Sequence, residues 1–355
     1  MWIRKFTVIM SFGKILKPFI KNLTFISGCI ISALVICTGM CISCNNVQKR
    51  VIYKPVIDSE WWDITNQPDL GDWTGTRQEP VDFGVWKAKD GTWQLWSCIR
   101  GTRVGGTGRL FYRWEGNSLS EINWKPMGIA MLADTTLGET FGGLQAPFVF
   151  EENDVYYMFY GDWKRICLAR SDDGKTFTRV INETGTPALF SGPLDNSRDP
   201  MVIKIDDTYY CYYCDHSRTD NGSFEAQGAV FCRTSKDMKT WSEPVVVSRG
   251  GSVLEQCNWY AGDVECPFVF KIDDQYILFR NQLYGRYSLN TQYSSRNPLD
   301  FGDNHDDYMV GQLHVTAPEI VRDGDQYYIV ALKRKLDGMR VAKIKFVKEE
   351  VVKKR

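Results

Sequence analysis

The chain has 355 residues, of which 43% are apolar, enough to bury the core of a globular protein. Its 43 basic and 43 acidic residues cancel, and no long basic run interrupts this balance, so the composition predicts no nucleic-acid partner.

Residues 1–44 have the pattern of an export segment. Basic residues precede a charge-free stretch from Asn22 to Gln48, whose centre, Leu23–Ser43, is mostly apolar. The run is long enough to span a bilayer, so an uncleaved anchor is one alternative. The other is cleavage, because Ser43-Cys44 resembles a bacterial lipoprotein signal, as does an earlier box at Cys29. We expect an exported lipoprotein, acylated on Cys44, at the cell surface or facing the periplasm of a bacterium.

A pattern of paired strands then occurs five times. In each copy a short apolar strand leads through an acidic or glycine turn into a strand rich in Tyr, Phe or Trp, which is typical of a β-hairpin. A second hairpin follows in most copies. The copies begin at Asp82, Ala146, Asp199, Cys266 and Ala317.

Four strands in each of five copies predict an all-β fold, a five-bladed β-propeller with four antiparallel strands per blade. We place this single domain at residues 76–347. A tether and N-terminal closing segment occupies 45–75, and a basic C-terminal tail occupies 348–355. Seven cysteines follow the export segment, an odd number scattered through strand-like sequence, which predicts buried free thiols rather than a disulfide framework.

Three acidic boxes stand where strands begin: Val81-Asp82-Phe83, Arg198-Asp199-Pro200 and Val264-Glu265-Cys266-Pro267. The first strand of every blade of a propeller lines the central channel, so the residues that open these strands meet at one mouth. An Asp before a strand can also cap a turn. Because the other two copies carry Ala146 and Ala317, turn capping is a poor common explanation.

Two of the boxes resemble signatures of glycoside hydrolase family 32, the invertase and fructanase group. The resemblance implies that Asp199 stabilises the transition state and that Glu265 is the general acid/base. The five blades and three carboxylates also resemble family 43, the arabinosidase and xylosidase group, which implies that Asp82 is the general base. The first box of family 32, Asn-Asp-Pro-Asn-Gly, is represented here only by Val81-Asp82-Phe83-Gly84. The family within this furanosidase superfamily is therefore left open.

A glycoside hydrolase of this kind needs one carboxylic acid at the leaving oxygen and one carboxylate across the ring. We expect Glu265 to be the acid, with a pKa raised by the charge of Asp199. Asp82 is then a nucleophile or a general base, depending on its distance from Glu265. The expected substrates are furanosyl or pentosyl glycans, namely arabinosides, xylosides or fructosides.

Three further residues are candidates for the site. Arg198 contacts a substrate hydroxyl or pairs with a neighbouring blade. Trp86 is expected to stack on a sugar, because it lies in a blade that carries an acidic box. His314 precedes the first strand of the fifth copy. The family 43 pattern places a metal-binding His in that blade, which suggests substrate contact and a structural calcium in the central channel. No cofactor is required, and we expect a monomer.

Two other functions fit the same pattern. One is a carbohydrate-binding propeller without activity, although three converging carboxylates repel one another and add little to a pure binding site. The other is a related propeller phosphorylase, which needs a basic cluster for phosphate. Arg100, Arg103 and Arg109 form the dense basic group near a box.

Overall fold

The computed structural model describes residues 48–353 apart from 195, 218–227 and 254–263. Regular structure in these residues consists of strands and three short 3-10 helices, η1 (Gly71–Trp73), η2 (Thr135–Leu137) and η5 (Gly285–Tyr287). No helix in this part of the chain is long and apolar enough to cross a membrane. The predicted all-β class is confirmed.

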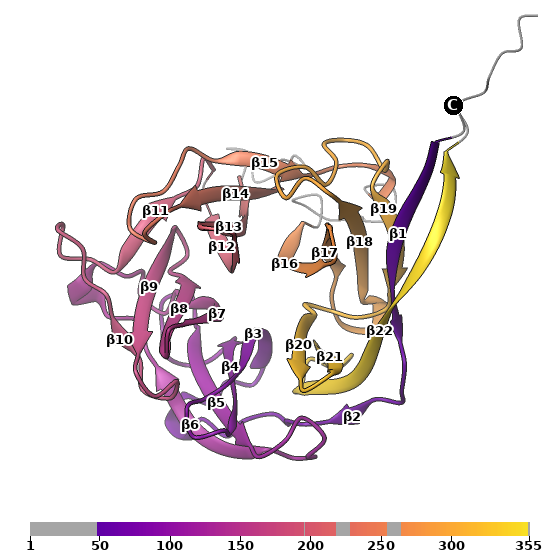
Figure 1. The fold of residues 1–355 in the computed structure, drawn as a ribbon. Helices are drawn as coiled ribbons and strands as arrows, with labels where there is room; N and C mark the ends of the chain where they lie inside the picture. Colours follow the sequence, from indigo (N-terminus) through magenta and orange to yellow (C-terminus); the bar gives the residue numbers. More distant parts are fainter. Residues whose placement is uncertain (1–47, 195, 218–227, 254–263, 354–355) are drawn as a thin grey trace, which may run out of the picture. The chain divides into compact units, whose positions relative to one another are not determined.

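The strands form five antiparallel sheets arranged around a central channel, as predicted for a five-bladed propeller (Figure 1). Blade I contains β3 (Glu79–Lys87), β4 (Trp93–Arg100), β5 (Leu110–Gly116) and β6 (Lys125–Met131). Blade II contains β7 (Gln145–Glu152), β8 (Val155–Gly161) and β9 (Arg165–Ser171), with β10 (Thr178–Arg179) and β11 (Ala188–Ser191) both pairing with β9.

The other three blades follow the same plan. Blade III contains β12 (Asn196–Ile205), β13 (Thr208–His216), β14 (Ala229–Ser235) and β15 (Val245–Ser248). Blade IV contains β16 (Glu265–Ile272), β17 (Gln275–Leu283), β18 (Leu289–Ser295) and β19 (Met309–Leu313). Blade V contains β20 (Glu319–Asp323), β21 (Gln326–Leu332), β22 (Met339–Lys353) and β1 (Gln48–Ile57).

Strand β1 closes the ring. It pairs with β22 from Gln48↔Lys353 to Ile57↔Ile344, so the N-terminal strand supplies the outer edge of blade V. The short β2 (Trp62–Asp63) pairs with the other end of β22. Residues 348–353, which we expected in a basic tail, are therefore strand, because β1 provides a partner for their backbone groups.

The five copies found in the sequence coincide with a backbone feature of the channel. Their first residues all have positive φ, between 39° and 56°, which is uncommon outside glycine. In β3, β7, β12 and β16 the strand register shifts at this point, which marks a β-bulge. Bulges re-aim side chains, and these four turn Asp82, Ala146, Asp199 and Cys266 toward the channel; Ala317, just before β20, has the same positive φ and lines the same cavity.

The core lies between neighbouring blades. Rings from adjacent sheets meet edge to face, for example Phe111 of β5 with Tyr160 of β8 and Phe150 of β7 with Tyr209 of β13. The packing holds the blades together and fixes the inner strands that carry the bulges.

Candidate active site

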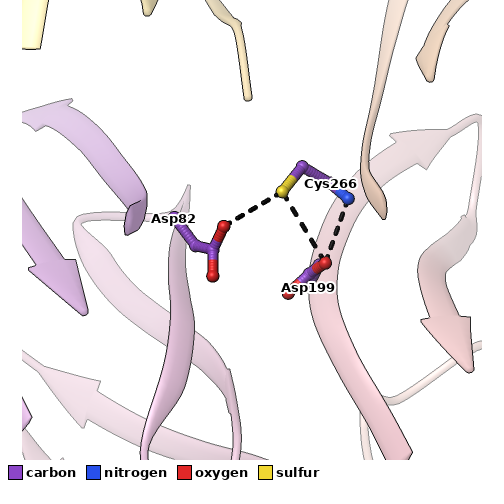
Figure 2. A group of neighbouring side chains, drawn as sticks. All are labelled: Asp82, Asp199 and Cys266. Atoms are coloured by element: carbon purple, nitrogen blue, oxygen red, sulfur yellow. Dashed lines mark hydrogen bonds between the residues drawn. The ribbon is translucent and has the colours of Figure 1, made fainter. Parts of the chain in front are cut away.

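The bulges bring Asp82, Asp199 and Cys266 into one cavity of ≈ 30 Å³ in the channel. Figure 2 shows that the three side chains point toward one another from blades I, III and IV. A carboxylate oxygen of each Asp and the Cys266 Sγ lie within 4.8 Å of one another. The equivalent residues of blades II and V, Ala146 and Ala317, line the cavity without adding charge.

Asp199 is held at the centre of this group. Its Oδ2 accepts hydrogen bonds from the Cys266 backbone N–H (3.0 Å) and the Cys214 thiol (2.9 Å), and Cys266 Sγ lies 3.6 Å away. Its Oδ1 is buried and has no hydrogen-bond partner. Burial first and then the charge of Asp82 raise the pKa of Asp199 to about 7, although Arg198 opposes the shift. Asp199 therefore holds a proton in much of the protein at neutral pH.

Asp82 lies on the other side of the cavity and is also buried. The hydroxyl of Tyr284, just after β17, donates to Asp82 Oδ1 (2.9 Å), and Cys266 Sγ lies 3.2 Å from the same oxygen. Tyr284 is a site residue that the sequence analysis missed. Its contact crosses from blade IV to blade I, and one Tyr among 17 gives no local signal of it.

Glu265 occupies a different position from the two aspartates. It is the first residue of β16 and precedes the bulge residue Cys266, so it aligns with Arg198 rather than with Asp199. Its Oε1 accepts a hydrogen bond from Arg198 Nη2 of blade III. Burial raises the pKa of Glu265, but Arg198, with smaller contributions from His216 and Tyr284, more than offsets burial, and the net pKa is lowered. This corrects the expectation that Asp199 raises the pKa of Glu265: in this structure the raised pKa belongs to Asp199.

Arg198 in turn is fixed by the end of β13. Its Nη1 donates to Asn196 Oδ1 (2.7 Å) and its Nη2 meets His216 Nδ1 (2.5 Å). A guanidinium only donates, so Nδ1 must accept and the proton of the neutral imidazole lies on Nε2, which donates to the Val264 carbonyl (3.1 Å). Burial first and then Arg198 lower the pKa of His216 to about 3. In the structure Arg198 pairs with a residue of a neighbouring blade, which was the second of the two expectations for it.

His216 is a second site residue that the sequence analysis missed. It is the last residue of β13 and is 5% exposed. The pairing of β12 with β13 places His216 opposite Asn196, two residues from Arg198. Aligning the two strands of this hairpin would therefore have indicated His216.

Trp86 and His314 lie elsewhere. Trp86 is buried, its indole N–H donates to the Gly174 carbonyl (2.8 Å), and its ring packs on Trp96 and Phe177. The ring has no free face for a sugar, which corrects the stacking expectation. His314 is exposed, its Nδ1 lies 3.2 Å from the Ser288 carbonyl, and it does not line the cavity.

The channel does not fit the calcium that we expected near His314. Calcium takes six to eight oxygen ligands. In the part of the chain that the structure describes, the group with suitable spacing is Asp82, Asp199 and Cys266, which includes a sulfur and excludes His314.

The basic group considered for phosphate is divided among other contacts. Arg100 binds Glu79 through Nε (2.9 Å) and Nη2 (2.7 Å). Arg109 lies over the ring of Trp163 and contacts Cys98 Sγ (3.7 Å). Arg103 is exposed. Cys44 and the rest of the predicted export segment lie outside the described residues. The six described cysteines are free, as predicted.

Comparisons with known proteins give a family and a fold. A protein-family model described as "Glycosyl hydrolases family 32 N-terminal domain" matches residues 113–336, more than half of the chain. The match contains Asp199 and Glu265 but not Asp82. No curated protein matches the chain.

Solved structures resemble the whole propeller. One is a thermostable family-43 glycoside hydrolase, with 17% identity over 79% of this chain and 96% of that chain and a TM-score of 0.57. Another is a GH43 β-xylosidase/α-arabinofuranosidase from a compost microbial metagenome, in complex with xylotriose and in a calcium-free form (17% identity, 81% and 98% coverage, TM-score 0.51). A third comes from the GH130 mannoside phosphorylases, a family described as containing glycoside hydrolases that target β-1,2 mannosidic linkages in Candida mannan (13% identity, 81% and 94% coverage, TM-score 0.53). At these identities the likeness concerns the fold.

Proposed function

The chain belongs to glycosyl hydrolase family 32, within the propeller superfamily that includes family 43, and is a glycoside hydrolase; from this premise we propose that it cleaves furanosyl or pentosyl glycans, namely arabinosides, xylosides or fructosides. The observation that carries the proposal is the convergence of Asp82 and Asp199 in one cavity, with Glu265 beside it on the neighbouring strand. The xylotriose complex of the GH43 relative supports a pentosyl substrate.

The three carboxyl groups have different roles in this proposal. Glu265 protonates the leaving oxygen, and Asp82 is the carboxylate across the sugar ring, where positive charge develops in the oxocarbenium-like transition state. Asp199 binds a sugar hydroxyl through its unpartnered Oδ1 and keeps its proton or shares it with the group. This division follows the environments, because Asp199 is the most buried of the three carboxyl groups.

Arg198 holds Glu265 in its ionised form before substrate binds. A general acid must carry a proton, so the glycoside has to displace or weaken this ion pair when it enters. We assign Arg198 to substrate binding in the same step, since a guanidinium released from Glu265 can donate to a sugar hydroxyl.

The cell location is part of the proposal. The basic and apolar residues at 1–44 support export, and Ser43-Cys44 supports a lipid anchor on Cys44 of a bacterial surface or periplasm-facing lipoprotein, acting as a monomer on oligo- or polysaccharides. Metabolic labelling with a fatty acid tests the anchor: Cys44→Ser should abolish the label and release the protein from membranes, whereas Cys29→Ser should not.

Aryl glycosides of arabino, xylo, fructo and galacto configuration test the activity. Turnover of one pentosyl or fructosyl substrate by the wild type, and a loss of at least about a hundredfold in Asp82→Asn and Glu265→Gln, are expected. NMR of the first sugar anomer released then shows whether Asp82 acts as nucleophile or base.

Two outcomes would replace the proposal. Release of a sugar phosphate that depends on added phosphate would make the protein a phosphorylase. Glycan binding that is equal in wild type and Glu265→Gln, without cleavage by either, would make it a carbohydrate-binding propeller.

A further inference from the structure

The cavity at the channel mouth contains, beside Asp82 and Asp199, a thiol that glycoside cleavage does not require. Cys266 Sγ lies with oxygens of Asp82 and Asp199 within a 4.8 Å group, contributed by three different blades at equivalent bulge positions. Figure 2 shows the sulfur between the two carboxylates. Carboxylate oxygens and a cysteine thiolate are each ligands that zinc takes in proteins.

A second observation points to an occupant. Asp199 is 4% exposed, yet its Oδ1 has no hydrogen-bond partner, whereas Oδ2 accepts from the Cys266 backbone N–H and the Cys214 thiol. Buried polar atoms are normally paired, so an unpaired carboxylate oxygen at a cavity indicates a missing partner. The cavity volume of ≈ 30 Å³ suits one small occupant, such as an ion or a water.

The charges of the cavity favour a cation over a neutral occupant. Two buried carboxylates face each other, and the repulsion between them contributes to the raised pKa of Asp199. Arg198 is the cation beside them, but its Nε is 3.8 Å from Asp199 Oδ2 and its Nη2 is bound to Glu265. The remaining bulge residues, Ala146 and Ala317, bring no charge. A divalent ion would neutralise the negative charge of this pair.

The sulfur selects the kind of ion. Calcium and magnesium prefer oxygen ligands only, whereas zinc and cadmium bind thiolates together with carboxylates and accept three protein ligands with one open position. A second sulfur, Cys214 Sγ, lies 2.9 Å from Asp199 Oδ2 and adds to the soft character of the site. On binding, the Cys266 S–H bond breaks and the metal–sulfur bond forms, and the thiol proton passes to solvent together with the proton that Asp199 holds.

We propose that a thiophilic divalent cation, zinc or cadmium in chemical class, binds to Asp82, Asp199 and Cys266 and inhibits the enzyme by occupying the place of the sugar. The inhibition rests on the proposed function, because it assumes that Asp82 and Asp199 act on the substrate. The binding itself does not.

Cadmium tests the binding directly, because a cadmium–thiolate bond absorbs in the ultraviolet. The full-length wild type is titrated with Cd²⁺, and the spectrum of Cys266→Ser under the same conditions is subtracted. A saturable difference band at one equivalent is expected. Cys232→Ser, which removes a buried thiol of β14 far from the cavity, should keep the band. A band of equal size in Cys266→Ser would overturn the site.

Asp199→Asn provides an independent variant if Cys266→Ser fails to fold. It keeps the thiol and should raise the cadmium dissociation constant at least about tenfold. An unchanged constant would remove Asp199 from the site. A hundredfold excess of Ca²⁺ or Mg²⁺ should leave the band intact, and competition by either ion would show a site for hard cations instead.

Zn²⁺ kinetics test the inhibitory part. Zn²⁺ should raise the apparent KM of the wild type for its glycoside with little change in kcat, and the ratio of inhibited to uninhibited rate should return to near one in Cys266→Ser. If the wild type cleaves no glycoside, the proposed function fails while the cadmium band still reports the site. If cadmium binds and Zn²⁺ leaves turnover unchanged, the overlap of ion and sugar is overturned.

Discussion

Arg198 of blade III forms an ion pair with Glu265 of blade IV, and it does so with the guanidinium nitrogen that also meets His216. The pair links the first strands of two adjacent blades at the mouth of the channel. It also favours the charged form of Glu265, since Arg198 is the main group that lowers the pKa of that carboxyl against burial. The proposed acid, Glu265, is therefore ionised before substrate binds, and its protonation depends on whether its ion pair with Arg198 is weakened.

Replacing Arg198 with Lys should move the pH profile of the enzyme. Lysine keeps the charge but loses the planar fork, so it cannot bind Glu265, Asn196 and His216 together. The pKa of Glu265 should rise. Because a general acid loses activity as pH rises through its pKa, the basic limb of kcat/KM should shift to higher pH while the maximum falls.

A matched control is Arg165→Lys, which alters an ion pair of similar geometry with Asp162 in blade II. Its pH profile should match that of the wild type. An unshifted basic limb in Arg198→Lys would show that Arg198 does not control the ionisation of Glu265.

His216 should act as a positioning residue through Arg198. His216→Phe removes the acceptor at Nδ1 and leaves a buried guanidinium nitrogen with one partner fewer, at a cost of about 1–3 kcal/mol in the free energy of unfolding. It should also lower kcat and shift the basic limb in the direction of Arg198→Lys. His216→Asn offers an oxygen near the position of Nδ1 and should restore part of both effects.

The control for this pair is His314→Asn, an exposed histidine outside the cavity. It should leave stability and the pH profile unchanged. If His216→Phe and His216→Asn lose activity equally and without a pH shift, the imidazole serves packing alone.

The fold could be predicted from the sequence because each blade repeats the same local pattern. The copies were aligned on their first residues, and those residues proved to be the bulge positions of the channel. The repeat therefore located Asp82 and Asp199 correctly in the cavity. It could not separate Glu265 from Cys266, because a box read as a unit does not say which of two adjacent residues occupies the bulge.

Contacts between blades account for what the sequence did not reveal. The distance from Arg198 to Glu265 depends on how two blades pack, and no spacing along the chain encodes it. The same holds for Tyr284 and Asp82. Trp86 was misjudged for a related reason, since a Trp in an inner strand can face either the channel or the neighbouring blade, and here Trp96 and Phe177 cover it.

Asp199 should make the stability of the protein depend on pH. Its pKa in the folded state is about 7, above the ordinary value of 3.8, so the folded state binds more protons than the unfolded state between these values. The free energy of unfolding should therefore fall as pH rises from about 4 to 7, by an amount on the order of 2–4 kcal/mol from this group.

Asp199→Asn resembles the protonated carboxyl at every pH and should remove this part of the slope. Urea denaturation of wild type and variant at pH 4, 5.5 and 7 measures the difference, with the variant gaining on the wild type as pH rises. A constant difference across the range would contradict the raised pKa.

Glu319 is a second buried carboxyl of the channel, and its role should be structural. Its Oε2 accepts a hydrogen bond from the Val85 backbone N–H (3.0 Å), which ties the first residue of β20 in blade V to β3 in blade I. Burial raises the pKa of Glu319 well above its ordinary value, which favours the neutral form of this carboxyl in the folded protein. A neutral carboxyl that only accepts a hydrogen bond can be replaced by an amide.

Glu319→Gln should therefore keep the contact with Val85. It should also become more stable than the wild type as pH rises, because only the wild type must take up a proton at this carboxyl on folding, which costs free energy. Glu319→Leu removes the acceptor, leaves the Val85 N–H unpaired, and should be about 1–3 kcal/mol less stable than Glu319→Gln at every pH. Glu60→Gln, at an exposed carboxylate, controls for the change of charge and should show neither effect. Equal stability losses in Glu319→Gln and Glu319→Leu would mean that the ionised form of Glu319 is needed, and that a cation of the channel mouth pairs with it.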